Sequence, residues 1–348
     1  MTEQRLFQNL PQPSPSVDGL AFAVRVTPDG CEDLHWDDLD RLDGSLAERS
    51  FDTNLPVKSV VWVHLDLHHD RARSWVRTHI GLTSDESDAM LGDFTQPHSV
   101  VSRDSLLLFL RGVNCNPNAD LEDLISIRAF LTPSLIVTMR SAPIRSSREV
   151  LATLRKGMQI AHSIDIFIPF LRQLLAKVEA VSDQLGDSLG ELEEEMIDKV
   201  DQSHMSKLTT LRQQIIQLRR YIRPQREMLE SCPIEELTWS REIDTDRLAH
   251  CAHTNARVVE ELMMFSERSH VLQDDAANAQ VFQLTRSTYL LTKIASIFLP
   301  LGLLTGLLGV NVDGIPLKNS PWGFAIVCAA LLALGIVMGV VIRRVDRD

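Results

Sequence analysis

The sequence predicts an N-terminal α/β domain, long stalk helices after it and a C-terminal hairpin of two transmembrane helices. Three observations carry this prediction: short β-branched apolar runs in the first half, long amphipathic patterns after residue 164, and two uncharged apolar segments near the end. The 348 residues exceed what one ordinary core holds, so we expect two or three structural regions.

The first region, residues 1–163, has the pattern of a mixed sheet with interleaved helices. Helical periodicity occurs at Ala72–His79 and Asp85–Leu91, and Ser146 with Glu149 three residues later has capping-box spacing for a further helix. Five apolar runs bounded by turn residues predict strands: Leu20–Val26, Ser59–Leu67, Ser105–Gly112, Leu124–Leu131 and Leu135–Met139.

Residues 164–290 are expected to form long stalk helices. The amphipathic patterns cover Ile164–Leu192 and Ser203–Leu229, and a third begins at Thr245 with no strong breaker before Pro300. If Thr245–Leu308 is one helix, its roughly 64 residues reach about 100 Å. Such a helix would pass from the soluble part into the membrane.

Residues 291–312 and 320–342 are the two predicted transmembrane helices. The uncharged run Ile294–Val312, roughly 19 residues, covers about 30 Å of hydrocarbon, and the run Ser320–Ile342 is slightly longer. Trp322 stands at a boundary where interfacial aromatics occur. The alternative, a hairpin buried in a soluble core, is disfavoured because core helices of soluble proteins usually carry a polar stripe.

The loop 313–319 is short enough to require a tight antiparallel turn, so the ends of both spans that lie away from this loop face the same side. Basic residues gather at those ends: Arg286, Lys293, Arg343, Arg344 and Arg347. By the positive-inside tendency, the N-terminal part and the tail 343–348 are cytoplasmic and the loop 313–319 is external.

The composition excludes several functions. A formal net charge of −12 disfavours nucleic-acid binding, which needs a Lys/Arg surplus on some face, and fits a cationic partner. The sequence has no Gly-rich phosphate loop, nucleophile elbow or catalytic-triad spacing, so we expect neither an enzyme nor ATP-driven transport. The five cysteines form no C-x-x-C pair, which agrees with a reducing cytoplasm around the soluble part.

A stripe of small and hydroxyl residues recurs with heptad-like spacing along the first span and the helix before it. Such a stripe suits the lining of a narrow channel, which needs several copies of the hairpin, and equally suits close helix packing of the Gly302-x-x-x-Gly306 type. Its members are Gly309, Gly306, Gly302, Leu299, Ala295, Thr292, Thr288, Thr285, Val281, Asn278 and Asp274.

At Gly309-Val310-Asn311, at the outer end of the first span, the sequence resembles the CorA family of divalent-cation transporters, and it is most similar to the zinc-transporting ZntB branch. The magnesium branch typically has Gly-Met-Asn, whereas Val310 and the following Val312–Pro316 resemble the zinc branch. Two further segments carry the resemblance, Leu218–Arg226 and Trp62–Asp66.

The resemblance implies a homopentameric funnel in a bacterial-type inner membrane, with the first spans lining the pore. It also implies an Asn311 ring at the outer mouth, with Gly309 and Val310 shaping the loop that presents it. An amide ring offers carbonyl dipoles to a hydrated dication without the tight binding of carboxylates. We expect Zn²⁺ as the transported ion, other divalent cations as alternatives, and no cofactor.

Other candidate metal ligands have weaker support. His250 and His253 share a helix face and could hold zinc with a group from another chain. Asp274 and Asp275 could attract cations at the pore entrance, or could be ordinary solvated charges. His64, Asp66 and His68 look like a metal cluster, but a strand end that turns into a helix is the favoured interpretation.

Three hypotheses for the function follow. The first is a pore or transporter for zinc, with a magnesium or cobalt channel of the same family as its variant. The second is a membrane-anchored sensor that does not conduct, and the third is a membrane-tethered metal hydrolase that uses His64, Asp66 and His68.

Overall fold

The computed structural model describes residues 16, 18–41, 59–93, 96–116, 123–198, 200–309 and 321–345. The chain divides into two compact units, Met1–Val271 and Leu272–Asp348. The finer division predicted from the sequence, at residues 163, 290, 312, 319 and 342, stays a prediction.

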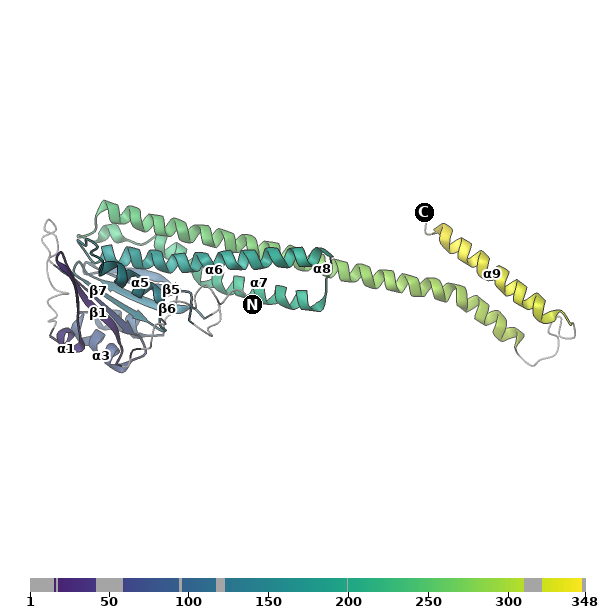
Figure 1. The fold of residues 1–348 in the computed structure, drawn as a ribbon, viewed down its shortest axis with the longest axis horizontal. Helices are drawn as coiled ribbons and strands as arrows, with labels where there is room; N and C mark the ends of the chain where they lie inside the picture. The colour runs from purple at the N-terminus through teal and green to yellow at the C-terminus, as the bar shows by residue number, and fades with distance from the viewer. Residues whose placement is uncertain are drawn as a thin grey trace. The chain divides into compact units, whose positions relative to one another are not determined.

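Within the described residues, the first unit holds a mixed sheet of seven strands in the order β2-β1-β3-β7-β6-β5-β4 (Figure 1). Neighbouring strands are antiparallel except for β3 and β7, which are parallel. The strands are β1 Leu20–Thr27, β2 Gly30–Asp33, β3 Val60–Asp66, β4 His98–Ser102, β5 Ser105–Gly112, β6 Ile125–Leu131 and β7 Leu135–Arg140.

All five predicted strands are confirmed, and β2 and β4 are additional. Both additional strands lie at the edges of the sheet, where β2 is largely exposed and β4 is only partly buried. Edge strands with this little burial carry a weak apolar pattern, which is why periodicity missed them.

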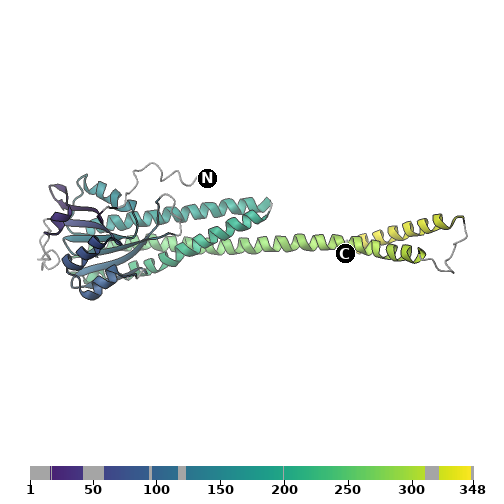
Figure 2. The same cartoon turned by 90° about the horizontal axis from the view of Figure 1, so that it is seen from below.

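Helices cover both faces of the sheet (Figures 1 and 2). One face packs on α1 Trp36–Leu39, α3 Asp70–His79 and α4 Ser84–Leu91. The other packs on α5 Arg145–Leu154 and α6 Ile164–Asp198. Because side chains alternate along a strand, Val63 enters the first core while Trp62 enters the second. Strands β5, β6 and β7 are buried along their whole length, as expected for a sheet between two helical layers.

The capping box predicted at Ser146 is wrong. Helix α5 begins at Arg145, with Ile144 as its N-cap and no capping side chain, and Ser146 lies in the first turn. The buried Ile144 is extended, with φ −127° and ψ 135°, so the helix starts two residues earlier than the capping-box spacing required. A true capping box forms instead at α4, where Thr83 and Glu86 exchange hydrogen bonds.

The three long helices are confirmed as α6, α7 Gln202–Glu230 and α8 Glu242–Leu308, with the 3₁₀ turn η2 Ile234–Glu236 between the last two. Helix α8 is continuous over 67 residues and includes Pro300. Its first part, up to Val271, belongs to the first unit and the rest to the second. In the first unit α6, α7 and α8 share an apolar core that includes Val178, Ile215 and Val258.

A buried carboxylate ties the start of α8 to the start of α6. Asp165, whose side chain is 8% exposed, accepts hydrogen bonds from Arg241 Nη2 at 2.6 Å and Arg247 Nη1 at 2.9 Å. Its other oxygen accepts from the backbone amides of Ala161 at 2.9 Å and His162 at 3.2 Å. We call these contacts the Asp165 clasp.

The Asp165 clasp also changes the acidity of its own carboxyl group. Burial raises the pKa of Asp165, but the hydrogen bonds from Ala161 N, Arg241 and His162 N outweigh this and hold the pKa below its ordinary value. The carboxylate is therefore ionised at neutral pH and pairs with the two guanidinium groups.

Candidate permeation path

The described part of the second unit contains the last part of α8 and helix α9 Gly323–Val345. Both helices are long and apolar enough to cross a membrane, with mean hydropathies of 1.8 and 2.9 over their most apolar windows. These windows are not buried, and large apolar side chains such as Phe298 and Phe324 are exposed. A lipid environment or further copies of the chain would remove this apolar surface from water.

An open groove runs along α8 where the sequence predicts the pore-lining stripe. Its volume is about 430 Å³, and it is lined by Val281, Leu284, Thr285, Thr288, Tyr289 and Thr292. Four predicted stripe residues, Val281, Thr285, Thr288 and Thr292, therefore share one surface of this helix. This shared surface agrees with the spacing argument, while the pore-lining role itself stays a prediction.

The hydroxyl groups of the stripe bond to the backbone of their own helix. Thr285 Oγ1 donates to Val281 O at 2.8 Å, and Thr292 Oγ1 donates to Thr288 O at 2.9 Å. Each of these hydroxyl oxygens therefore keeps lone pairs that can accept from water, so the groove offers polar atoms without a charge among its apolar side chains. Such a surface can solvate a hydrated cation without holding it tightly.

The rest of the predicted stripe is exposed in the single chain. These residues are Asp274, Asn278, Ala295, Leu299, Gly302, Gly306 and Gly309. Beyond the adjoining backbone of the same helix, no atom of the described residues lies within 4 Å of a methyl group placed at Gly302 or Gly306, so nothing in this part of the chain requires glycine there. Close approach of another copy of the helix would explain both glycines.

The predicted selectivity motif lies mostly outside the described residues. Gly309 follows the last residue of α8, and its amide donates to Thr305 O at 3.0 Å, whereas Val310, Asn311 and the predicted loop 313–319 are not described.

The predicted entrance residues lie on the exposed surface of α8. Asp274 and Asp275 are exposed near the start of the second unit, and His250 and His253 are exposed in the part of α8 that belongs to the first unit. Among the described residues, no group of three or more His, Cys, Asp or Glu side chains could hold a metal ion. A zinc site at His250 and His253 would therefore need ligands from another chain.

The candidate cluster on β3 is split by the fold. The strand ends at Asp66 and α3 begins at Asp70, so the predicted turn from strand into helix is confirmed. His64 is completely buried and its Nδ1 lies 2.6 Å from Thr138 Oγ1, whereas His68 is exposed. Asp66 accepts a hydrogen bond from the buried Arg140 at 2.7 Å.

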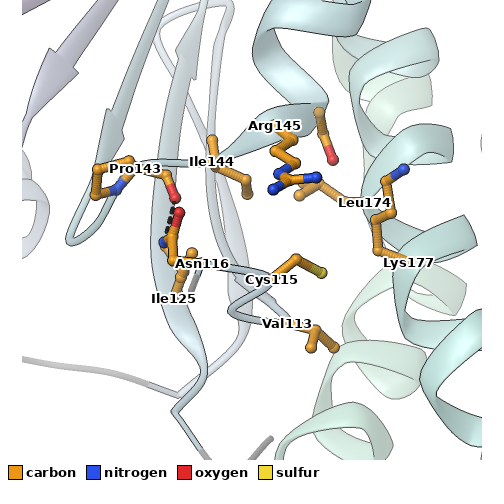
Figure 3. A pocket seen from close by; sticks show the side chains of 10 residues that line it. Val113, Cys115, Asn116, Ile125, Pro143, Ile144, Arg145, Leu174 and Lys177 are labelled. Atoms are coloured by element: carbon orange, nitrogen blue, oxygen red, sulfur yellow. Dashed lines mark hydrogen bonds between the residues drawn. The ribbon is translucent and has the colours of Figure 1, made fainter. Parts of the chain in front are cut away.

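A small cavity lies beneath the start of α5 (Figure 3). Its volume of about 10 Å³ holds about one water molecule, so it is not a substrate pocket. Burial raises the pKa of the lining thiol Cys115, although Lys177 and Arg145 oppose this shift. The thiol is therefore protonated at neutral pH and is no reactive nucleophile.

Sequence reasoning missed the Asp165 clasp, which fixes the start of the helix that carries the stripe. Asp165 is 76 positions from Arg241 and 82 positions from Arg247 along the chain, so no periodic pattern joins them. The only local signal was the Arg241, Asp244 and Arg247 spacing of three residues, which brings these side chains together around the start of α8.

A soluble α/β unit, a long helix that leads out of it and a pair of apolar helices define a membrane protein of the two-span type. Residues 57–344 match the family described as CorA-like Mg2+ transporter protein. The chain therefore belongs to the CorA family of divalent cation transporters, a family of ion transporters and not of enzymes.

Individual relatives support the same family. The chain is 32% identical to the "Divalent cation transporter CmaX" of Pseudomonas aeruginosa, over 83% of this chain and 88% of that protein. It is 30% identical to the "Zinc transport protein ZntB" of Yersinia enterocolitica, over 85% of this chain and 90% of that protein.

Solved structures show the same fold. The full-length CmaX structure matches with a TM-score of 0.79 at 29% identity, over 96% of this chain and 99% of that chain. The CorA magnesium transporter of Methanocaldococcus jannaschii matches with a TM-score of 0.75 at 17% identity, over 95% and 99%. This second match supports the fold alone. The predicted family and fold class are thus confirmed.

Proposed function

We propose that this protein conducts divalent cations, zinc among them, through a pore that five copies form around their α8 helices. The uncharged threonine groove on α8 carries this proposal, because Thr285, Thr288 and Thr292 bring hydroxyl groups to one surface of the helix where it enters its apolar span. A single hairpin has no closed wall around such a surface. A ring of copies would enclose it and cover the exposed apolar side chains.

The choice of zinc rests on two observations. Val310 departs from the Gly-Met-Asn motif of the magnesium branch, and one of the relatives at 30% identity bears the name of a zinc transport protein. Magnesium is the competing ion, because the family description names it. Both ions are divalent and hydrated, so an amide ring at Asn311 could accept either.

The orientation follows from the basic residues at one end of the second unit. Arg286 and Lys293 precede the uncharged part of α8, and Arg343 and Arg344 end α9. We place these residues, the first unit and both termini on the cytoplasmic side of a bacterial-type inner membrane.

The proposal is tested by the flux of zinc and of magnesium into vesicles that contain the purified full-length protein and an internal indicator dye. Asn311→Ala should change the zinc flux severalfold or more, whereas the same replacement at Asn319, in the loop outside the motif, should change it little. Zinc flux in the Asn311→Ala variant equal to that of the wild type would remove the asparagine ring from the mechanism.

The number of copies is tested separately by native mass measurement in detergent. We expect a particle of five chains. A dimer would contradict the ring and would favour the second candidate, a membrane-anchored sensor that does not conduct.

A further inference from the structure

A polar cleft lies in the first unit at the end of the sheet where β5 and β7 finish and β6 begins. These three ends meet because β6 is antiparallel to both of its neighbours. The cleft has a volume of about 260 Å³, slightly below the range of about 300–1,000 Å³ for drug-sized ligands, so it suits a smaller molecule. Its lining includes Arg111, Asn114, Asp123, Ser141 and Ala142 from around the strand ends and Tyr221 from α7.

Backbone contacts fix two of these residues on the sheet. Ser126 of β6 pairs with Arg111 of β5. The amide of Ser126 donates to Ser141 Oγ at 2.9 Å, and the amide of Ser141 donates to Ser126 O at 3.0 Å. The amide of Arg111 donates to the Oε1 atom of the buried Gln225 of α7 at 2.7 Å. Arg111 and Ser141 are therefore both held beside Ser126, and the cleft has a rigid wall.

Arg111 supplies a cation to this cleft. The residue is 9% exposed, its Nη1 donates to Leu124 O at 3.4 Å, and its guanidinium carbon lies 5.0 Å from the centroid of the Tyr221 ring. Burial lowers the pKa of Arg111 and Tyr221 opposes this shift, and a guanidinium stays protonated at neutral pH. Its planar fork of N–H donors matches the two oxygens of a carboxylate.

Asp123 supplies the opposite charge. Its side chain is exposed, and its carboxylate forms no hydrogen bond or ion pair with any other residue that the structure describes, Arg111 included. Asn114 and Ser141 add an amide and a hydroxyl group to the lining. The cleft therefore presents one cationic and one anionic group that do not pair with each other, together with neutral polar groups.

We propose that this cleft binds a small zwitterion, an α-amino acid with a short polar side chain. The carboxylate of the ligand pairs with Arg111 and its ammonium group pairs with Asp123, while the amide and hydroxyl groups of the lining suit a polar side chain. A ligand with a single charge would use only one of the two charged residues. The proposal depends neither on membrane insertion nor on conduction.

The test measures binding to the full-length protein in uncharged detergent by titration calorimetry. The probes are L-serine and two analogues that each lack one of its charged groups: 3-hydroxypropionate lacks the ammonium group, and ethanolamine lacks the carboxylate. We expect serine to bind at least about tenfold more tightly than either analogue. A tenfold difference corresponds to about 1.4 kcal/mol, roughly the contribution of one hydrogen bond to a charged group.

Three variants separate this site from general charge effects. Asp123→Asn should weaken serine binding about tenfold but should not weaken 3-hydroxypropionate, which has no ammonium group for Asp123 to bind. Ala142→Leu keeps both charges and fills part of the cleft, so serine binding should fall by at least as much. Asp183→Asn is the matched control, because Asp183 is an exposed carboxylate on α6, and serine binding should be unchanged.

Unfolding temperatures equal to that of the wild type establish that the variants are folded. Serine that binds no more tightly than its two analogues would overturn the proposal. An equal loss of serine and 3-hydroxypropionate binding in Asp123→Asn would also overturn it, as would an equal loss of serine binding in Asp183→Asn. Zinc flux is a separate readout, so a protein that conducts zinc and binds no serine would refute this proposal alone.

Discussion

Replacing Asp165 by asparagine tests whether the Asp165 clasp holds α8 in place. The substitution keeps the shape of the side chain and one oxygen, which can still accept from the amides of Ala161 and His162. An NH₂ group would then face the guanidinium groups of Arg241 and Arg247, which now donate at 2.6 and 2.9 Å. The two charge-assisted hydrogen bonds are lost, and the NH₂ group of the asparagine faces the N–H donors of the two arginines.

The magnitude follows from the burial of the partners. A hydrogen bond to a charged group contributes about 1.5–3 kcal/mol, but both arginines are more than one-third exposed, so solvent reduces each contribution. We expect Asp165→Asn to lower the free energy of unfolding by about 2–3 kcal/mol. For a unit of this size, that is a fall of about 4–8 °C in the unfolding temperature.

The assay is thermal unfolding of the full-length protein in detergent, followed by circular dichroism. Glu227→Gln is the matched control, because its partner Arg223 is an exposed neighbour on the same helix, and we expect almost no change. The folded-state pKa of Asp165 is depressed, so its contribution is present above the ordinary pKa of about 4 and is lost as the pH falls further. The difference in unfolding temperature between the wild type and the Asp165→Asn variant should therefore shrink below about pH 4. An unfolding temperature within a degree of the wild type at pH 7 would refute the clasp.

Three further predictions address the core, the helix packing and the groove. Burial, with Arg140 and Arg148 nearby, holds the pKa of His64 well below its ordinary value, so the folded protein should lose up to about 1.4 kcal/mol per pH unit as the pH falls below about 6.5. His64→Phe should reduce the fall in unfolding temperature at acidic pH. An unchanged fall would contradict the role given to His64. A methyl group at Gly186 would lie 2.6 Å from the ring of Phe265, whereas Gly190 has open space, so Gly186→Ala should destabilise by about 1–2 kcal/mol and Gly190→Ala should not. Equal unfolding temperatures for the two variants would count against this packing of α6 on α8. Thr288→Val should reduce zinc flux severalfold in vesicles at an unchanged unfolding temperature, and full flux would show that the groove does not line the path.

The sequence predicted those elements whose side chains face an apolar core. β3, β5, β6 and β7 are strongly buried and were found from their apolar runs, as were the long helices with one apolar face. The edge strands β2 and β4 were missed because their side chains contact too little core to need an apolar pattern. The start of α5 was misplaced because the buried Ile144 fixes it, and burial at a single residue has no periodicity.

The candidate site was predictable in part for a similar reason. The spacing of Thr285, Thr288 and Thr292 fixes their common face on any straight helix, and the structure places them in one groove. The Asp165 clasp depends on which distant segments meet, which local patterns do not encode. The role of Asn311 came from resemblance to a family motif and lies outside the described residues.

In the proposed function, assembled copies of this chain let divalent cations cross a bilayer. It is tested most directly by the rate at which external zinc reaches an indicator dye inside vesicles, compared between vesicles with and without the full-length protein. We expect a rate that rises with the amount of protein and with an inside-negative potential. Identical rates with and without protein, in vesicles shown to contain intact assemblies, would contradict it.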